Sequence, residues 1–155
     1  MNTQIKMRPV NSDIAFDDKK FVFNVRNNDL SIKNSLNNNP ISWEQHCLWY
    51  EKTITNVNNL FYIFSLDADL IGYFRADESN KVSVALDKKY VGKGLSTEVI
   101  RLGTIEVVNT RKSVLVAEIK KTNVPSIKSF TKAGYKYHSN YSKDGETIDV
   151  YRFSI

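Results

Sequence analysis

Residues 81–96 contain the feature that most constrains the fold of this chain: a strand, a glycine loop and the start of a helix. Val82, Val84 and Leu86 alternate with other residues and predict the strand. Gly92 and Gly94 lie in the loop, and because glycine lacks a Cβ its backbone can approach a ligand closely. The first N–H groups of a helix attract anions, so the stretch predicts a phosphate-binding loop. Apolar residues of the helical pattern follow it: Leu95, Val99, Leu102 and Ile105.

Two other kinds of phosphate-binding loop do not fit this stretch. A Walker loop ends in Gly-Lys-Ser/Thr, but Lys93 is followed by Gly94, and the position of the first glycine is Asp87. The dinucleotide-binding loop needs a third glycine at position 97, where this chain has Thr97. A Gly-x-Gly after a strand is also consistent with a plain turn that opens a helix. The rest of the chain therefore has to decide between these interpretations.

Residues 113–135 carry a second pattern. The β-branched run at 113–119 predicts a strand, and residues 123–135 predict a short helix. The helix signals are an apolar face, a proline in the first turn and a glycine that ends the helix in the left-handed conformation: Ile127, Phe130, Pro125 and Gly134.

Together these motifs resemble the GNAT (GCN5-related) N-acetyltransferases. Residues 89–94 have the form x-x-x-Gly-x-Gly of that family's pyrophosphate loop. Asn123, a short helix and Gly134-Tyr135 are similar to its second signature. The family prefers Gln or Arg where this chain has Lys89, a departure that keeps a hydrogen-bond donor. Both motifs occur in the expected order, so the chain is identified by resemblance as a GNAT enzyme.

The resemblance implies an α/β (α+β) fold in one domain, residues 1–155. We expect a mixed, mostly antiparallel sheet of about seven strands, a splayed fourth and fifth strand and about four helices. The order is β-αα-βββ-α-β-α-ββ. Outside the two motifs, the N-terminal half is expected to contain a strand at 5–8, a helix capped by Ser12, a loop or frayed helix at 27–39 and a helix with a Ser42/Gln45 capping box. The helix capped by Ser12 carries Phe16, Phe21, Val22 and Val25. Two hairpins are expected, one of 60–66 and 70–75 and one of 135–142 and 147–154 that turns at Asp144-Gly145.

Composition is consistent with one soluble enzyme domain. The chain has 155 residues, of which 41% are hydrophobic and 25% charged, and no run approaches the ~18 apolar residues of a membrane span. The N-terminus lacks the apolar core of a signal peptide, so we expect a cytoplasmic protein. The net charge of +5 is spread without a dense basic run, which favours an anionic small substrate over nucleic acid. The lone Cys47 predicts a small buried hydrophobe rather than a nucleophile.

The resemblance also implies acetyl-CoA as the cofactor. Its contacts would come from the strand before the loop, from the loop and helix start, and from the second signature: Ala85, Leu86, Lys89, Val91, Gly92, Lys93, Gly94, Leu95, Ser96, Asn123, Ser126 and Phe130. No metal ion is expected.

A second resemblance concerns the acceptor. Arg26-Asn27 and the helical pattern Glu44-x-His46-x-x-Trp49 are similar to enzymes that acetylate nucleotide-linked amino deoxysugars, such as the acetyltransferase of pseudaminic acid synthesis. His46 and Trp49 share a helical face, where an imidazole can bond oxygens and an indole can stack on a ring. The structural alternative is a core stripe of Trp43, Cys47, Tyr50 and Ile54, with Trp49 at its rim.

The other expected acceptor contacts are Arg26, Asn27, Tyr73 and Arg75. Arg26 can form a bidentate contact with phosphate, but a salt bridge with Asp29 or Glu51 explains it equally well. Tyr73 and Arg75 are two residues apart and therefore lie on the same face of the predicted strand. This face either lines the acceptor cleft or is exposed to solvent.

Several residues are candidates for the catalytic acid and base. Many relatives carry a Tyr acid at the position of Phe130, so Tyr135, Tyr137 or His138 substitutes, solvent suffices, or catalysis is lost. A carboxylate base near residues 77–83 is doubtful, and water relayed by Ser83 or His46 is our hypothesis.

Three functions follow. The first is an N-acetyltransferase for a small, nucleotide-linked amine, with a homodimer left open and no nucleic-acid or membrane partner. The others are a peptide α-amine acetyltransferase of the ribosomal-protein type and a silent acyl-CoA-binding module.

Overall fold

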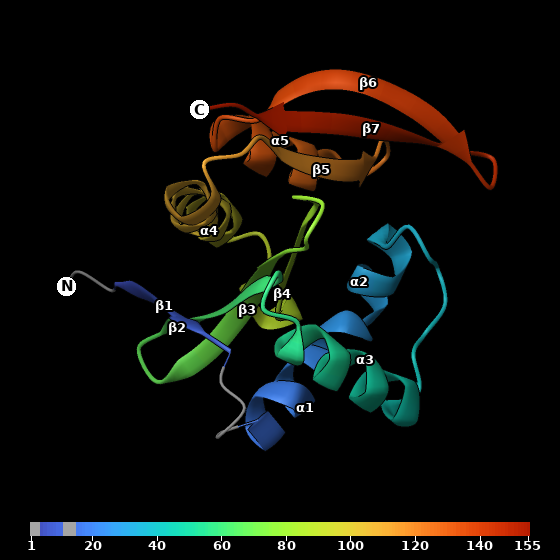
Figure 1. Ribbon diagram of the computed structural model, residues 1–155. Helices are drawn as coiled ribbons and strands as arrows, with labels where there is room; N and C mark the ends of the chain where they lie inside the picture. The colour runs from blue at the N-terminus through green and yellow to red at the C-terminus, as the bar shows by residue number, and fades with distance from the viewer. Residues whose placement is uncertain (1–3, 11–14) are drawn as a thin grey trace.

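Four strands form one sheet and three form a second sheet (Figure 1). The computed structural model describes residues 4–10 and 15–155. The elements of this part of the chain are β1 (Ile5–Pro9), α1 (Ala15–Arg26), α2 (Asp29–Asn34), α3 (Trp43–Thr55), β2 (Leu60–Leu66), β3 (Asp69–Ala76), β4 (Val82–Leu86), a 3₁₀ turn (Lys88–Tyr90), α4 (Leu95–Arg111), β5 (Leu115–Lys120), α5 (Val124–Lys132), β6 (Lys136–Lys143) and β7 (Glu146–Phe153).

The fourth and fifth strands diverge after a single isolated backbone bridge. The first sheet has the order β1-β2-β3-β4 and the second β5-β7-β6, with every neighbouring pair antiparallel. In the described part of the chain, the backbone link between the two sheets is one isolated parallel bridge between Lys81, just before β4, and Val116 of β5, with a 2.9 Å hydrogen bond from the Val116 N–H to the Asn80 carbonyl. The predicted fold class and splay are confirmed. The splay is large enough to divide the expected seven-stranded sheet into two.

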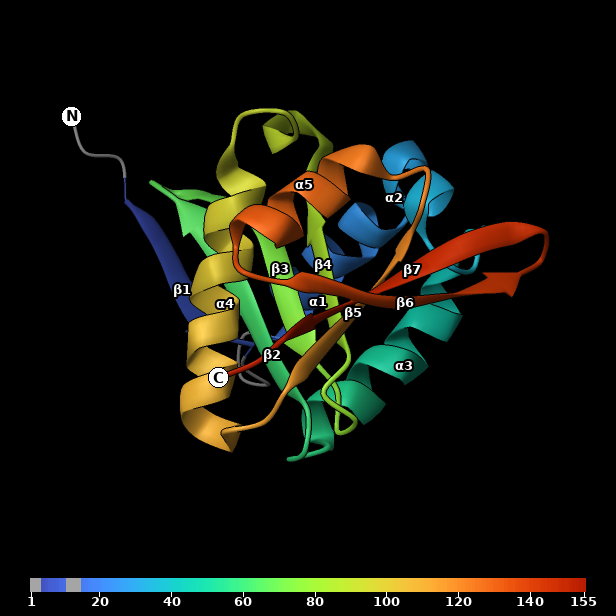
Figure 2. The same ribbon diagram turned by 90° about the horizontal axis from the view of Figure 1, so that it is seen from above.

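Helices cover both faces of the first sheet. Helix α4 packs on one face, and α1 with α3 on the other, as the two views in Figures 1 and 2 show. The alternation of side chains along β2 and β3 supplies both cores. On the α1/α3 side the buried residues are Val22, Val25, Tyr50, Phe61, Ile63 and Tyr73.

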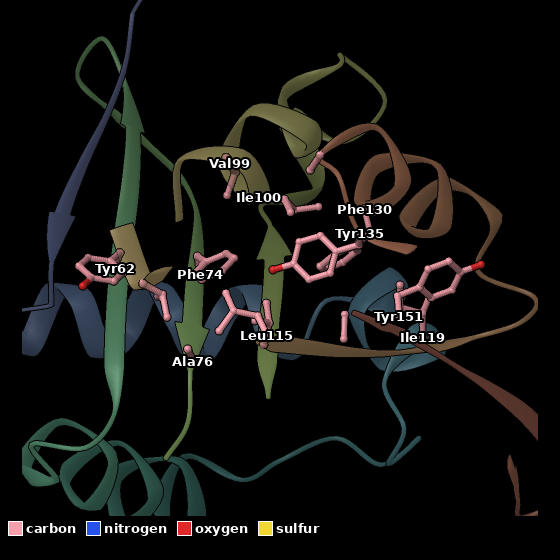
Figure 3. Packing of buried hydrophobic residues seen from close by; sticks show 14 of the residues in the cluster. Tyr62, Phe74, Ala76, Val99, Ile100, Leu115, Ile119, Phe130, Tyr135 and Tyr151 are labelled. Carbon is pink, nitrogen blue, oxygen red and sulfur yellow. The ribbon is translucent and has the colours of Figure 1, made fainter. Parts of the chain in front are cut away.

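The larger core lies between the first sheet, α4, α5 and the second sheet (Figure 3). It joins Phe74 of β3 to Ile100 of α4, Leu115 of β5 and Phe130 of α5. Helix α4 lies very close to β3 at Gly103, where an added Cβ would be only 2.4 Å from Cγ of Phe74. Glycine at this position therefore sets the approach of the helix that follows the glycine loop.

Local sequence signals located most elements. The Ser42 hydroxyl accepts from the Gln45 N–H, and the Gln45 side chain accepts from the Ser42 N–H, both at 3.2 Å, so the predicted capping box is confirmed. Asp144 and Gly145 turn the last hairpin with φ of 51° and 78°, as a two-residue type I′ turn requires. The predicted Ser12 cap lies outside the described residues.

Two details differ from the predictions. Ile105 is 43% exposed, because the buried stripe of α4 runs through Val99, Ile100, Gly103, Thr104 and Val107 instead. In α3 the buried residues are His46, Tyr50 and Thr53, whereas Trp43 is 38% exposed. The expected core stripe of α3 is thus rotated by about one residue, toward the face that carries His46 and Trp49. Within 4–10 and 15–155, no helix is long and apolar enough to cross a membrane.

Candidate active site

The glycine loop is held at its base and open at its tip. The Asp87 carboxylate accepts from the Lys89 N–H at 3.0 Å, and the Tyr90 hydroxyl donates to Asp69 at 2.8 Å. Gly92 and Gly94 have φ of 80° and 77°, which L side chains rarely adopt, and a Cβ at either residue would meet no atom within 4 Å. The open space beside both glycines leaves the backbone free to contact a ligand.

The N-terminus of α4 meets this loop without a side-chain cap. Gly94 is the N-cap residue and supplies no side-chain acceptor, so the first N–H groups of a 17-residue helix lack that partner. Lys89 and Lys93 place their ammonium groups 5.6 and 5.9 Å from the Tyr90 ring centroid, beside the loop. Uncapped N–H groups, positive charge and glycine backbone fit the pyrophosphate of a coenzyme A. Val91, Leu95 and Ser96 belong to the same segment.

Strand β4 provides an edge for the rest of such a cofactor. Ala85 and Leu86 lie at its C-terminal end, away from the bridge at Lys81, where β4 and β5 have diverged. Gly72 allows β3 to come close here, since a Cβ on Gly72 would be 2.5 Å from the Ala85 carbonyl oxygen. The antiparallel partner on one side leaves the other edge of β4 available for hydrogen bonds.

The second motif places its residues in structural roles. The Asn123 side chain accepts from the Ser126 N–H at 3.4 Å and caps α5. Phe130 is 5% exposed and packs edge-on against Tyr135, with centroids 4.9 Å apart. Cofactor contacts from Asn123, Ser126 and Phe130 stay predictions.

Tyr135 is buried, which argues against its predicted role as proton donor. It is 1% exposed, and its hydroxyl shares a 2.8 Å hydrogen bond with Thr104 of α4 in the core shown in Figure 3. Burial raises the pKa of Tyr135, while the bond to Thr104 lowers it by a smaller amount. Of the two other candidates, Tyr137 is exposed and accepts from Asn140 at 2.8 Å, and His138 is exposed beside Ser139.

A cluster of two arginines and aromatic rings forms on the α1/α3 face of the first sheet. Arg26 lies with its Cζ 3.9 Å from the centroid of Trp49, and Cζ of Arg75 lies 5.4 Å from the same ring. Tyr73 is buried beside them, and Ser83, opposite Arg75 in the β3–β4 register, accepts from its Nη2 at 3.2 Å. The predicted residues Arg26, Trp49, Tyr73, Arg75 and Ser83 therefore come together.

Neither arginine has a carboxylate partner among residues 4–10 and 15–155. No ion pair joins either one to a described acidic side chain, so the predicted alternatives Asp29 and Glu51 do not explain Arg26. Burial lowers the pKa of Arg26, Tyr73 raises it by a smaller amount, and the charge of Arg75 lowers it by less again. Guanidinium stays charged in spite of such shifts, so the cluster holds two like charges.

His46 is fully buried beneath Arg26, and its ring geometry specifies the tautomer. Nε2 lies 2.7 Å from the Lys19 carbonyl oxygen, which only accepts, and Nδ1 lies 3.1 Å from Nη1 of Arg26, which only donates. The ring is therefore neutral, with hydrogen on Nε2. Because both nitrogens are engaged, the geometry favours a role in positioning Arg26 over the predicted proton relay.

Both polar atoms of the Asn27 side chain bond to the backbone of Ile41. Its Nδ2 donates to the Ile41 carbonyl at 2.7 Å, and its Oδ1 accepts from the Ile41 N–H at 2.9 Å. These bonds tie the end of α1 to the start of α3. Because both polar atoms already hold the backbone, a structural role accounts for Asn27 better than the predicted acceptor contact.

Solved structures share the architecture of this chain over almost its whole length. No protein-family model and no curated protein sequence matches the chain. A protein proposed to be a phosphinothricin N-acetyltransferase superimposes with a TM-score of 0.80 at 16% identity, covering 97% of this chain and 98% of its own. The chain has the GNAT fold.

Other structures with the GNAT fold carry ligands or named activities of their own. A spermidine N-acetyltransferase, SpeG from Vibrio cholerae, has a TM-score of 0.80 at 14% identity and covers 98% of this chain and 94% of its own. AAC(6')-Ib in complex with ribostamycin and coenzyme A has a TM-score of 0.78 at 13% identity, covering 97% and 93%. At these identities the likeness establishes the fold.

The structural role of Lys120 was not predicted from the sequence. Lys120 is 3% exposed; its Nζ pairs with Glu146 at 3.1 Å and donates to the Lys33 carbonyl at 2.9 Å and to the Asn38 side chain. These contacts tie the segment after α2 to the second sheet. The sequence held a weak signal for it, a lysine at the end of an apolar strand.

His46 should make stability depend on pH. Burial lowers the pKa of His46 most, the hydrogen bond to the Lys19 carbonyl raises it by a smaller amount, and the charges of Arg26 and Lys19 lower it by less again. The unfolded chain takes up a proton near pH 6.5 while the folded protein does not, so stability is lost as pH falls below about 6.5. Urea unfolding between pH 7.5 and 5.5 should show a smaller loss for His46→Gln than for the wild type. An equal loss in both proteins would contradict the buried neutral ring.

Proposed function

We propose that the protein is an acetyl-CoA-dependent N-acetyltransferase. The observation that carries this proposal is the open loop of Gly92 and Gly94 at the uncapped start of α4, beside the free edge of β4. This combination suits a ligand that has both a pyrophosphate and an extended arm with amide groups. Acyltransferases with the same fold, including one complex with coenzyme A, support the proposal.

The reaction requires a neutral amine, a thioester carbonyl held near it and a route for two protons. Acetyl-CoA supplies an activated acetyl group. Attack by the amine forms the C–N bond and breaks the C–S bond, the amine proton passes to water, and the thiolate takes a proton from water. A thiol with a pKa near 8.5 is a fair leaving group at neutral pH, so a dedicated acid is dispensable. The chain's main contribution is then to position both reactants.

Ser83 is the polar side chain best placed to order the water that accepts the amine proton. It lies on β4 near Ala85, on the face that carries Tyr73 and Arg75. Its hydroxyl accepts from Arg75, so its own hydrogen and remaining lone pair are available to water. We assign it this role in place of the engaged His46.

For the acceptor we propose a primary amine on a nucleotide-linked amino deoxysugar. The resemblance of Arg26-Asn27 and His46-x-x-Trp49 to that subgroup supports it, as does the net charge of +5. The Trp49 ring is in contact with Arg26. The nucleobase would therefore stack beside this pair rather than displace it.

A turnover screen tests both parts of the proposal. Acetyl-CoA at about 100 times its dissociation constant should stabilise the fold by roughly 2.7 kcal/mol, read as a rise in melting temperature. Thiol release should then be measured with a nucleotide-linked amino sugar, the same sugar without its nucleotide, spermidine and N-terminal peptides. We expect the highest kcat/KM for the first. Highest activity on peptides would instead indicate the N-terminal acetyltransferase.

A silent acyl-CoA-binding module is the second candidate, and a specific observation favours it. Phe130 stands where relatives carry a Tyr acid, and the nearby Tyr135 hydroxyl is buried against Thr104. A melting shift with acetyl-CoA and no acceptor-dependent thiol release across the panel would support this module.

A further inference from the structure

The charge balance around Trp49 is incomplete. Three elements, α1, α3 and β3, bring two guanidinium groups to one indole ring, at 3.9 and 5.4 Å from its centroid. Neither has an acidic partner among the residues that the structure describes. Like charges repel, and partial burial strengthens the repulsion because water screens it less.

One donor of this pair is also unsatisfied. Nε of Arg75 is buried and has no hydrogen-bond partner in the described part of the chain, although its Nη2 bonds Ser83. Buried polar groups are satisfied in the great majority of folded proteins. An unpartnered guanidinium donor beside a second guanidinium is what an oxyanion would complete.

The arginines are fixed rather than mobile. Arg26 is held by Nδ1 of His46 at 3.1 Å and by the Trp49 face, and His46 is held in turn by the Lys19 carbonyl. Arg75 is held by Ser83 and by the same ring. Their side-chain entropy is thus largely lost before any ligand arrives, which favours tight anion binding.

We propose that Arg26 and Arg75 form one oxyanion subsite that holds a single phosphate or carboxylate group of the acceptor, with Trp49 as its floor. His46 and Ser83 are its positioning residues. The subsite implies that the substrate is an amine that also carries an anionic group. This assignment of the substrate class rests on the acetyltransferase function proposed above. Binding of the anion itself does not depend on acetyl transfer.

Direct titration with small anions tests the subsite without turnover. Inorganic pyrophosphate and succinate serve as the phosphate and carboxylate probes, measured calorimetrically at low salt. All variants carry Gly92→Asp, so that the glycine loop contributes no anion binding. Arg26→Gln and Arg75→Gln remove the charge and keep most of the side-chain length. Arg152→Gln, an exposed arginine on β7, is the matched control.

We expect each site variant to weaken binding of the preferred anion by roughly 10- to 100-fold, the loss typical of a hydrogen bond to a charged group. The control should leave it unchanged. Because both arginines hold the same anion, the double variant should lose less than the product of the two single losses. Tighter binding of pyrophosphate identifies a phosphate-bearing acceptor, and tighter binding of succinate a carboxylate-bearing one.

Two results would overturn the subsite. One is equal binding by the wild-type pair and by both single variants, with melting temperatures showing that the variants are folded. The other is a double variant whose loss equals the product of the single losses, which means that the two arginines do not act together on one anion. Failure of the acetyltransferase proposal is seen separately, as no melting shift with acetyl-CoA or no acceptor-dependent thiol release in the protein that retains Gly92.

Discussion

Replacing Gly92 with Asp is expected to abolish cofactor-dependent stabilisation and to lower kcat/KM for acetyl-CoA by about 100-fold or more. The φ of 80° at Gly92 strains the backbone of any L residue, but the space around it is open, so the new side chain meets no other atom and lies where an anion would approach. Its negative charge also opposes the positive end of α4. Melting curves with and without acetyl-CoA, together with initial rates, measure the effect.

Gly145→Asp is the matched control for this experiment. Gly145 has a φ of 78°, and a Cβ there would likewise meet nothing within 4 Å, but it lies in the β6–β7 turn. The control suffers the same backbone strain and charge change and should keep the cofactor shift. If Gly92→Asp binds acetyl-CoA as tightly as Gly145→Asp does, the loop has been assigned wrongly.

Phe130→Ala is expected to destabilise the fold by about 3 to 5 kcal/mol, because the ring is nearly fully buried in the core of Figure 3. The change also removes the edge-to-face contact with Tyr135 at 4.9 Å. Urea unfolding at pH 7 measures the loss as a shift of the midpoint at constant slope. Tyr137→Ala, at a 53% exposed tyrosine, is the control and should cost far less.

Phe130→Tyr separates packing from chemistry at the same position. If water protonates the thiolate, the added hydroxyl should leave the pH profile of turnover nearly unchanged. A large gain in turnover would show that the missing acid limits the enzyme. A loss of less than about 1 kcal/mol in Phe130→Ala would contradict the core role of the ring.

Short-range signals predicted the elements that frame the site. The glycine loop, the Ser42 capping box and the Asp144-Gly145 turn each depend on backbone conformations that neighbouring residues dictate. The same is true of the alternation in β3 that puts Tyr73 and Arg75 on one face. The order of elements followed from these local patterns, whereas the splay of β4 and β5 came from the family resemblance, because no local pattern tells whether two strands separated by α4 pair with each other.

The sequence by itself determined where the chain turns, which segments become strands and helices, and that a glycine loop opens α4. Only the tertiary structure decided what the acceptor side contains. Neighbouring stripes of α3 both carry aromatic side chains, and packing on the first sheet selected the one with His46, so the ring became neutral and bonded to Arg26. Likewise Tyr135 became a core residue because Thr104 of α4 meets its hydroxyl. Local pattern gives a side chain its element, whereas the surface against which that element packs gives it its partners and its charge state.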